Sequence, residues 1–484
     1  MPSNIDLEFR TCQRGLELPP SNWTNASRLE ASVSDAIDTY VFAEMRRQRI
    51  PGMALGIYKN GSIVLAKGYG KANLELNVPM TADSVLQSGS VGKSFTATAL
   101  MMLVERGKVK LDDSIRDYFP EGPDSWKEIR IANLLSHTSG LAAYDDPQLQ
   151  LPDGPFDIRR DYSEDELVAA IGKLPHDFDP GDDWAYKNTN FVLLGILIHR
   201  VTGQPYGEFL AQNIFRPLGM MSSSVISDQD IVPNRVSGYE MVGGVLKNQQ
   251  WVSPTFNSTA DGTLYFTVRD LEQWDRALCG ENLLKAASLE KMWTPYPYGG
   301  KSEKEGYGFG WRIQYINGRR VIGHNGAWQG FSTSFSRYLD DTLTIVALCN
   351  LDAMHCSPVS IVRAVAGIIS PSLEVPERPP IADDREKLTA SSWAQFCSLM
   401  NGDITGKGTQ TETFSAEQVR DLQSSLPVQW GENFPVLIER TVEKEGLISV
   451  YKIGNVNDTR LLRVLSLEDE GVASFSILAD PDNR

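Results

Sequence analysis

The order of strand and helix signals along this chain constrains its fold more than any single motif does. Two apolar runs, residues 53–58 and 63–69, flank Asn60-Gly61, a pair that favours the tight turn of a β-hairpin. Residues from about 95 to 290 then show mainly helical spacing. Short strand-like runs return after them, at residues 310–315, 320–323, 331–337 and 342–349. We therefore expect the early and late strands to share one sheet, with a helical lobe between them and a cleft where the two lobes meet.

Two helices of this lobe carry clear end signals. Residues 191–201 are closed by Thr202-Gly203, and residues 267–278 are opened by Thr267 with Asp270 three positions later. A threonine before the first turn accepts a hydrogen bond from a free backbone N–H, and glycine adopts the left-handed conformation that ends a helix. We expect helices over both segments.

Proline separates the carboxy-terminal part from the rest. Pro371, Pro376, Pro379 and Pro380 predict an extended linker, because proline cannot continue a helix. Beyond it, Ser415 with Gln418 forms a capping box. An antiparallel meander is predicted for residues 436–442, 447–453, 461–467 and 472–478. We divide the chain into an N-terminal extension (1–35), a main domain (36–370), a linker (371–383) and a small α+β accessory domain (384–484).

Composition argues against several functions. The chain has 484 residues, 41% of them hydrophobic, and its formal net charge of −16 would repel nucleic acid and anionic membranes. No apolar run reaches membrane-spanning length. The five cysteines are scattered without C-x-x-C spacing, and the five histidines include no H-E-x-x-H pair. We expect free thiols, no metal or other cofactor, no nucleic-acid partner and no membrane span.

The first residues lack the basic and apolar segments of a secretory signal. Two interpretations of the compartment stay open: a cytoplasmic protein, or a mature secreted or periplasmic form whose leader is missing. The sequons at Asn22, Asn25, Asn257 and Asn457 would matter only in a secreted chain.

The strongest chemical signal is the pair Ser90 and Lys93, at the start of a helical pattern that ends at Gly107. Side chains three positions apart on a helix face each other. A serine hydroxyl is a poor nucleophile at neutral pH, and a nearby ammonium and the helix N-terminus lower the cost of forming the alkoxide. The pair indicates an acyl-transfer enzyme. Gly92-Lys93-Ser94 also matches the end of a phosphate-binding loop, but that motif needs a glycine where this chain has Gln87.

Two further polar clusters each have a chemical and a plain structural explanation. In Tyr186-Lys187-Asn188 the tyrosine could act as a general base and the amide could orient a lysine or bind a substrate carbonyl. The alternative is a capped helix start with a half-buried tyrosine. In Gly323-His324-Asn325-Gly326 a glycine could admit a substrate backbone or acyl oxygen, and the alternative is a hairpin turn.

Together and in this order, Ser90-x-x-Lys93, Tyr186-x-Asn188 and His324-x-Gly326 resemble the motifs of the serine β-lactamase and penicillin-binding-protein superfamily, in its class C branch. Supporting phrases are Ser88-Gly89-Ser90 and residues 134–141, 214–220 and 307–311. That branch includes D-alanyl-D-alanine carboxypeptidases, D-aminopeptidases and carboxylesterases. The resemblance implies a β-lactamase/transpeptidase-like fold of the α/β (α+β) class, with helices flanking an antiparallel sheet.

The resemblance also implies roles for individual residues. Ser90 would be the acylated nucleophile, Lys93 its activator and Tyr186 the residue that passes a proton to the leaving group. Asn188 would contact Lys93 or the substrate amide.

Other residues would shape the cleft around this group. The backbone N–H groups of Ser90 and Ala327 would form the oxyanion hole, and His324, Asn325 and Gly326 would occupy an edge strand facing Ser90. Tyr144 would project into the cleft, and His137 is expected to be structural.

Two departures from the branch's pattern affect the expected substrate. Penicillin-destroying members usually have lysine where this chain has His324, which is largely neutral at pH 7, so the β-lactamase assignment is weakened. Lys187 stands where serine or alanine is commoner, and its charge would either act on Tyr186 or point outward.

We expect a serine hydrolase that cleaves small esters, amides or short peptides, including D-amino-acid peptides, through a Ser90 acyl-enzyme. A β-lactamase or an acyltransferase would use the same residues, and a penicillin-binding sensor without turnover is the alternative from another class. The accessory domain resembles cystatin-like or nuclear-transport-factor-like domains, with a lipocalin-like barrel as the rival. We expect it to carry no catalytic residue and either to cap the cleft or to mediate formation of a homo-oligomer.

Overall fold

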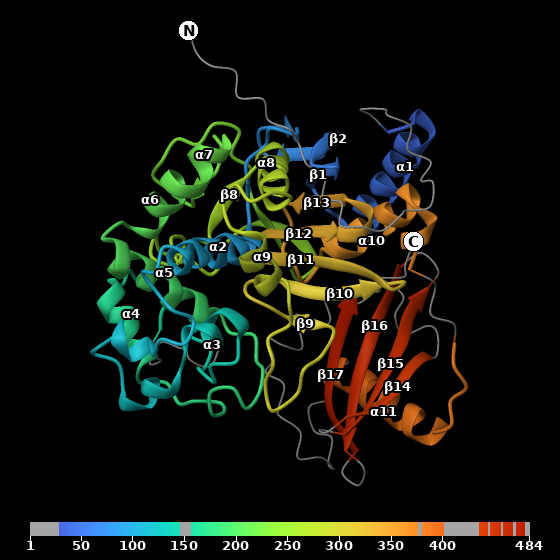
Figure 1. Ribbon diagram of the computed structural model, residues 1–484. Helices are drawn as coiled ribbons and strands as arrows, with labels where there is room; N and C mark the ends of the chain where they lie inside the picture. Colours follow the sequence, from blue (N-terminus) through green and yellow to red (C-terminus); the bar gives the residue numbers. More distant parts are fainter. Residues whose placement is uncertain are drawn as a thin grey trace.

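The computed structural model describes residues 29–145, 156–375, 380–400, 435–443, 446–455, 458–467 and 471–479. Its main part is built on an eight-stranded sheet in the order β3-β2-β1-β13-β12-β11-β10-β9 (Figure 1). These strands are β1 (Gly52–Lys59), β2 (Ser62–Asn73), β3 (Val78–Pro79), β9 (Gly306–Tyr307), β10 (Arg312–Ile316), β11 (Arg319–Trp328), β12 (Phe331–Tyr338) and β13 (Leu343–Cys349).

The large sheet joins the early and late strands of the chain, as predicted. β1 pairs with β13 in antiparallel register, with Met53 opposite Cys349. The predicted hairpin joins β1 to β2, and Asn60 and Gly61 take the positive φ angles of its tight turn, 53° and 71°. Both faces of β1 are buried, which explains why its sequence is continuously apolar rather than alternating.

β11 is longer than the predicted run at 320–323 and contains His324 and Gly326 within the strand. The alternative that this segment forms a hairpin turn is therefore wrong. β10 pairs only with residues 319–323 of β11. In the described part of the chain, residues 324–328 pair with β12 alone, so this half of β11 is locally an edge.

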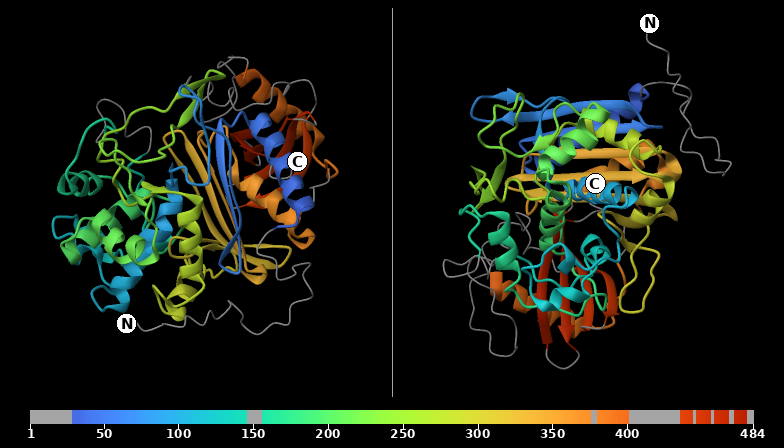
Figure 2. Two further views of the ribbon diagram at one scale, coloured as in Figure 1. Left: turned by 90° about the horizontal axis from the view of Figure 1, so that it is seen from above. Right: turned by 60° about the vertical axis from the view of Figure 1, so that its left-hand side comes forward.

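Helices cover both faces of the large sheet (Figure 2). α1 (Ala31–Gln48) and α10 (Pro358–Ile369) pack on one face, where Ile37 and Ile361 share a core with Leu55 of β1. α8 (Val268–Leu278) lies against β1, β2 and β13 on the other face, next to the helical lobe. Since successive side chains of a strand point to opposite faces, β1 contributes to both cores.

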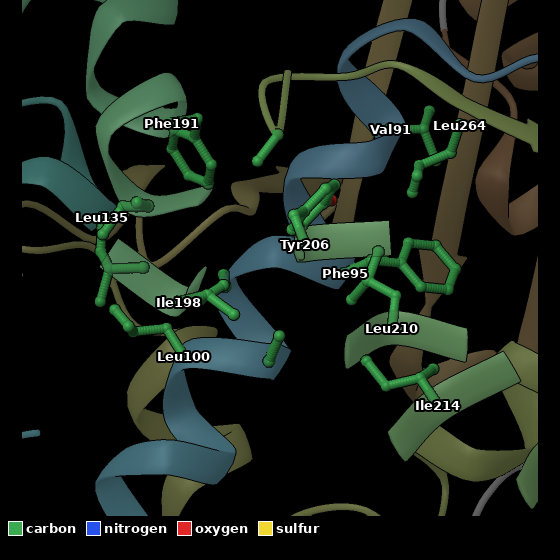
Figure 3. Packing of buried hydrophobic residues seen from close by; sticks show 14 of the residues in the cluster. Val91, Phe95, Leu100, Leu135, Phe191, Ile198, Tyr206, Leu210, Ile214 and Leu264 are labelled. Carbon is green, nitrogen blue, oxygen red and sulfur yellow. The ribbon is translucent and has the colours of Figure 1, made fainter. Parts of the chain in front are cut away.

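The helical lobe surrounds α2, which is buried along nearly its whole length. Phe95 of α2 stacks on Trp274 of α8 with ring centroids 3.9 Å apart, and Leu100 lies beside Ile198 (Figure 3). Such dense packing leaves a helix little freedom to shift. The helices of this part are α2 (Gly92–Glu105), α3 (Ile131–Ser136), α4 (Glu164–Ile171), α5 (Asn188–Thr202), α6 (Tyr206–Leu210), α7 (Arg216–Leu218) and α9 (Ala286–Met292).

The predicted helix ends are confirmed. α5 ends at Thr202, and Gly203 after it has a φ of 70°. The side chain of Thr267 accepts a hydrogen bond from the backbone N–H of Asp270 at 3.0 Å and caps α8. α2 ends two residues before Gly107, whose φ is 67°. Two small sheets complete the main part, formed by β4 (Leu86–Gln87), β8 (Leu264–Phe266) and β5 (Ser224–Val225), and by β6 (Tyr239–Val242) and β7 (Val245–Asn248).

The carboxy-terminal part forms a sheet of its own. Four antiparallel strands follow one another in sequence order, which confirms the predicted meander. Arg440 binds Asp383 and Asp384, both at 2.7 Å, and so ties the sheet to the segment that leads into it. Ser415 and Gln418 of the predicted capping box lie outside the described residues. The elements are α11 (Glu386–Met400), β14 (Val436–Glu443), β15 (Gly446–Asn455), β16 (Asp458–Leu467) and β17 (Gly471–Ala479).

The division of the chain into four parts stays a prediction from the sequence. α1 already begins at Ala31, inside the extension assigned to residues 1–35. Among the described residues, no helix is both long enough and apolar enough to cross a membrane.

Candidate active site

Ser90 lies where the sheet meets the helical lobe. It belongs to a 3₁₀ turn, Gly89–Val91, that runs directly into α2, and Lys93 lies in the first turn of α2. Both residues were predicted to lie in the first turn of the helix. Lys93 does, whereas Ser90 lies just before the helix begins. The two side chains still meet, with Lys93 Nζ 3.0 Å from Ser90 Oγ.

Glycines allow the backbone around Ser90 to pack closely against β11. Gly89 has a φ of +49°, and a Cβ added there would lie 2.3 Å from the backbone nitrogen of Ala327. A Cβ added at Gly326 would lie 2.2 Å from Ser88 O and 2.8 Å from Ser90 N. From the sequence, a glycine here was expected to make room for substrate. The structure fills this space with the protein's own backbone and so sets β11 directly beside the nucleophile.

Lys93 is fully buried, and each of its three N–H bonds has an acceptor. Nζ donates to Ser90 Oγ at 3.0 Å, to Asn188 Oδ1 at 2.7 Å and to the backbone oxygen of Asp261. A buried ammonium is costly unless it is fully hydrogen-bonded. This set of acceptors meets that requirement and holds the charge against the serine oxygen.

Tyr186 lies beside this ammonium. Its ring centroid is 5.1 Å from Lys93 Nζ and 5.6 Å from the guanidinium carbon of Arg312, and the centroid of the His137 ring lies 4.3 Å away. The Tyr186 hydroxyl is buried and has no hydrogen-bond partner among the described residues. A buried hydroxyl without a protein partner is available to a bound substrate.

His137 and Lys187 take supporting positions. His137 is completely buried, and its Nδ1 lies 3.2 Å from the backbone N–H of Lys187 and 3.1 Å from Asn190 Nδ2. Both partners are donors, so this nitrogen is the acceptor of the ring. The Lys187 ammonium forms an ion pair with Asp177 at 2.6 Å. Of the two alternatives for Lys187, the structure therefore favours a side chain directed to another part of the surface.

His324 is held as a neutral ring. Nδ1 lies 2.5 Å from the backbone oxygen of Asn325, which can only accept, so Nδ1 carries the proton and Nε2 accepts from the Tyr307 hydroxyl at 2.9 Å. Burial, followed by the charges of Arg312 and Lys93, lowers the pKa of His324 well below its usual value. The neutral state expected from the sequence agrees with this environment.

Tyr144 was expected to project into the cleft, but its side chain is buried. It is only 2% exposed, its ring stacks on Phe256, and its hydroxyl donates to Asp261 Oδ2 at 2.9 Å. It supports the segment whose backbone oxygen accepts from Lys93. A tyrosine with an apolar ring and a polar tip fits such a position because both parts are satisfied.

The start of α5 is joined to the segment after α3 at three successive residues. Asn188 Nδ2 donates to Asp145 Oδ2 at 2.6 Å, Thr189 Oγ1 donates to Ala142 O at 2.7 Å, and Asn190 Oδ1 accepts from Ser139 Oγ at 2.6 Å. Residues 134–141 and 186–188 were noted separately in the sequence. The fold places them side by side.

Sequence reasoning missed Asp145 and Asp261. Asp261 is 168 residues from Lys93 and contacts it through a backbone oxygen, which carries no signal in the sequence. Asp145 directly follows Tyr144, but only its contact with Asn188 makes it notable. Among the described residues, no group of three His, Cys, Asp or Glu side chains is placed to hold a metal ion.

Comparison with known proteins agrees with this arrangement. The sequence pattern of the Beta-lactamase family matches residues 37–366, more than half of the chain. Penicillin-binding protein 4* of Bacillus subtilis (strain 168) is 28% identical over 395 residues, which cover 76% of this chain and 85% of that protein. A D-aminopeptidase of Brucella anthropi is 26% identical over 66% of this chain and 60% of its own length.

Among solved structures, the octameric penicillin-binding protein homologue from Pyrococcus abyssi superimposes with a TM-score of 0.62. It covers 92% of this chain and 98% of its own, at 20% identity, and so supports the β-lactamase/transpeptidase-like fold. Because the family pattern matches most of the chain, and the fold and the homologues agree with it, the chain belongs to the Beta-lactamase family and is a serine hydrolase of that superfamily.

Proposed function

We propose that this protein hydrolyses amide or ester bonds of small substrates through an acyl-enzyme on Ser90. The observation that carries the proposal is the contact of Lys93 Nζ with Ser90 Oγ at 3.0 Å, made by a fully buried ammonium. An ammonium held there favours the ionised oxygen over the neutral hydroxyl and so activates the nucleophile.

Tyr186 completes the reacting group in this proposal. Its buried hydroxyl, without a partner among the described residues, would take up the proton that Ser90 loses as it attacks and give its own to the leaving nitrogen or oxygen as the substrate bond breaks. The close apposition of Gly89 and Ala327 supports an oxyanion hole built from the N–H groups of Ser90 and Ala327. Donors aimed at the developing oxyanion stabilise the transition state more than the ground state.

The substrate class follows from the neutral His324. A penicillin carboxylate is usually held by a fixed positive charge at this position, whereas here both ring nitrogens are already hydrogen-bonded. We therefore favour small amides, esters or short peptides, including those of D-amino acids, over β-lactams. The names of two relatives correspond to these two substrate classes: the D-aminopeptidase to D-amino-acid amides and peptides, and penicillin-binding protein 4* to β-lactams.

Three probes test the proposal with the full-length chain and its Ser90→Ala variant. A p-nitrophenyl ester, a D-amino-acid p-nitroanilide and a chromogenic cephalosporin are each assayed for turnover, and intact mass is recorded for an acyl adduct. We expect turnover of the ester or anilide that Ser90→Ala abolishes and that Ser125→Ala, an exposed serine, leaves unchanged. Turnover by the Ser90→Ala variant contradicts the proposal. A lasting cephalosporin adduct without turnover of any probe indicates a penicillin-binding sensor.

We also propose that the part from residue 384 onward carries no catalytic residue and either caps the cleft or mediates self-association. The octameric state of the homologue from Pyrococcus abyssi, whose match covers nearly the whole chain, supports the second role. Deletion of residues 384–484 tests both. Unchanged activity together with an unchanged oligomeric state, measured by light scattering, would exclude both roles.

A further inference from the structure

We infer that Asp145 is a positioning residue, which orients the side-chain amide of Asn188 so that its oxygen faces Lys93. The inference rests on the proposed function, because it assigns Asp145 a role at the same site. It starts from one chain of contacts: Asp145 Oδ2 accepts from Asn188 Nδ2 at 2.6 Å, and Asn188 Oδ1 accepts from Lys93 Nζ at 2.7 Å.

The chemistry of the three groups permits only this orientation of the amide. An ionised carboxylate has acceptors and no donor, an ammonium has donors and no acceptor, and the Asn188 amide has one end of each kind. Rotating the amide by half a turn would set its oxygen against the carboxylate and its NH₂ against the ammonium. Both contacts would then be repulsive, so Asp145 selects the rotamer that serves Lys93.

The backbone around Asp145 is held in place for this task. The neighbouring Tyr144 N–H donates to Thr189 Oγ1 at 2.9 Å, and Thr189 in turn donates to Ala142 O. Thr189 directly follows Asn188, so the residues on both sides of the Asp145–Asn188 contact are tied together. Because the backbone on both sides is already fixed, the two side chains lose little conformational entropy when they form this hydrogen bond.

The orientation of Asn188 matters because Lys93 has three N–H bonds and three acceptors. If the amide turned, the ammonium would lose Asn188 Oδ1 and would shift toward Ser90 Oγ or Asp261 O, the two acceptors that remain. A hydrogen bond to a charged group in a buried site is among the stronger ones.

A double-mutant cycle on the full-length protein tests this inference, with hydrolysis of p-nitrophenyl butyrate as the assay. Asp145→Ala should lower kcat about tenfold to a hundredfold with little change in KM, since the amide is freed but the cleft is unchanged. Asp145→Asn, whose side-chain oxygen can still accept from Asn188 Nδ2, should recover most of the loss. In the Asn188→Ala background, Asp145→Ala should have no further effect.

The controls separate this role from a structural one. Asp124→Ala, at an exposed acidic residue, should keep wild-type kcat, and urea unfolding should show that each variant is folded at the assay temperature. Wild-type kcat for Asp145→Ala overturns the inference. So does an equal loss in the Asn188→Ala background, which would mean that Asp145 acts independently of Asn188. Full activity of Ser90→Ala and Asn188→Ala would instead contradict the proposed function itself.

Discussion

Gly326→Ala would add a single methyl group at the tightest contact of the site. Its Cβ would lie 2.2 Å from Ser88 O, 2.4 Å from Thr333 Oγ1 and 2.8 Å from Ser90 N, whereas ordinary contact begins at 3.4 Å. Thr333 can rotate, but the two backbone atoms cannot turn away. β11 and the turn that carries Ser90 would therefore have to separate by about 1 Å, in a region where misplacement of this size costs about a hundredfold in rate.

We accordingly expect kcat/KM of Gly326→Ala to fall about a hundredfold, equivalent to about 2.7 kcal/mol, with about 1–3 kcal/mol lost from the free energy of unfolding. Ester hydrolysis and urea unfolding measure the two quantities. Gly280→Ala is the matched control, because a Cβ at Gly280 would have Asn282 Nδ2 as its nearest neighbour, at 3.8 Å. A folded Gly326→Ala enzyme with wild-type kcat/KM would refute the argument that this glycine sets the distance between β11 and Ser90.

Three further predictions concern charge. Lys93→Met keeps the apolar stem but removes the donor to Ser90 Oγ, so kcat/KM should fall at least about a hundredfold, and ester turnover near wild type would show that the ammonium is not needed. The pKa of His324 is depressed in the folded protein, chiefly by burial, so below about pH 6.5 the unfolded chain takes up a proton that the folded chain does not. The free energy of unfolding should therefore fall as the pH is lowered from 7 to 5. Urea unfolding should show a smaller fall for His324→Gln than for the wild-type protein. An equal fall in the two proteins would contradict this prediction. Asp275→Ala would remove the buried carboxylate that Arg337 Nε binds at 2.7 Å and should lower the free energy of unfolding by about 3–5 kcal/mol. Asp165→Ala, at an exposed carboxylate, should lower it by less than about 1 kcal/mol, and equal losses in urea unfolding would contradict this contrast.

Much of the fold was predictable because its signals are local. The turn at Asn60-Gly61, the Thr267 cap of α8 and the left-handed Gly203 after α5 each depend on backbone angles and hydrogen bonds within a few residues. The meeting of Ser90 and Lys93 is of the same kind, since three positions along a helical turn bring two side chains together. The order of these elements was enough to predict that β1 and β13 share a sheet.

The rest of the site depends on contacts between distant segments. Asn188 is 95 residues from Lys93, and the backbone oxygen of Asp261 is 168 residues away. Tyr144 was expected in the cleft but is buried, and its hydroxyl donates to Asp261, which is 117 residues away in the sequence. Residue types along the chain determined which side chains could react. Only packing decided which donors and acceptors face one another, because a buried polar group takes the partner that the fold brings within hydrogen-bond distance.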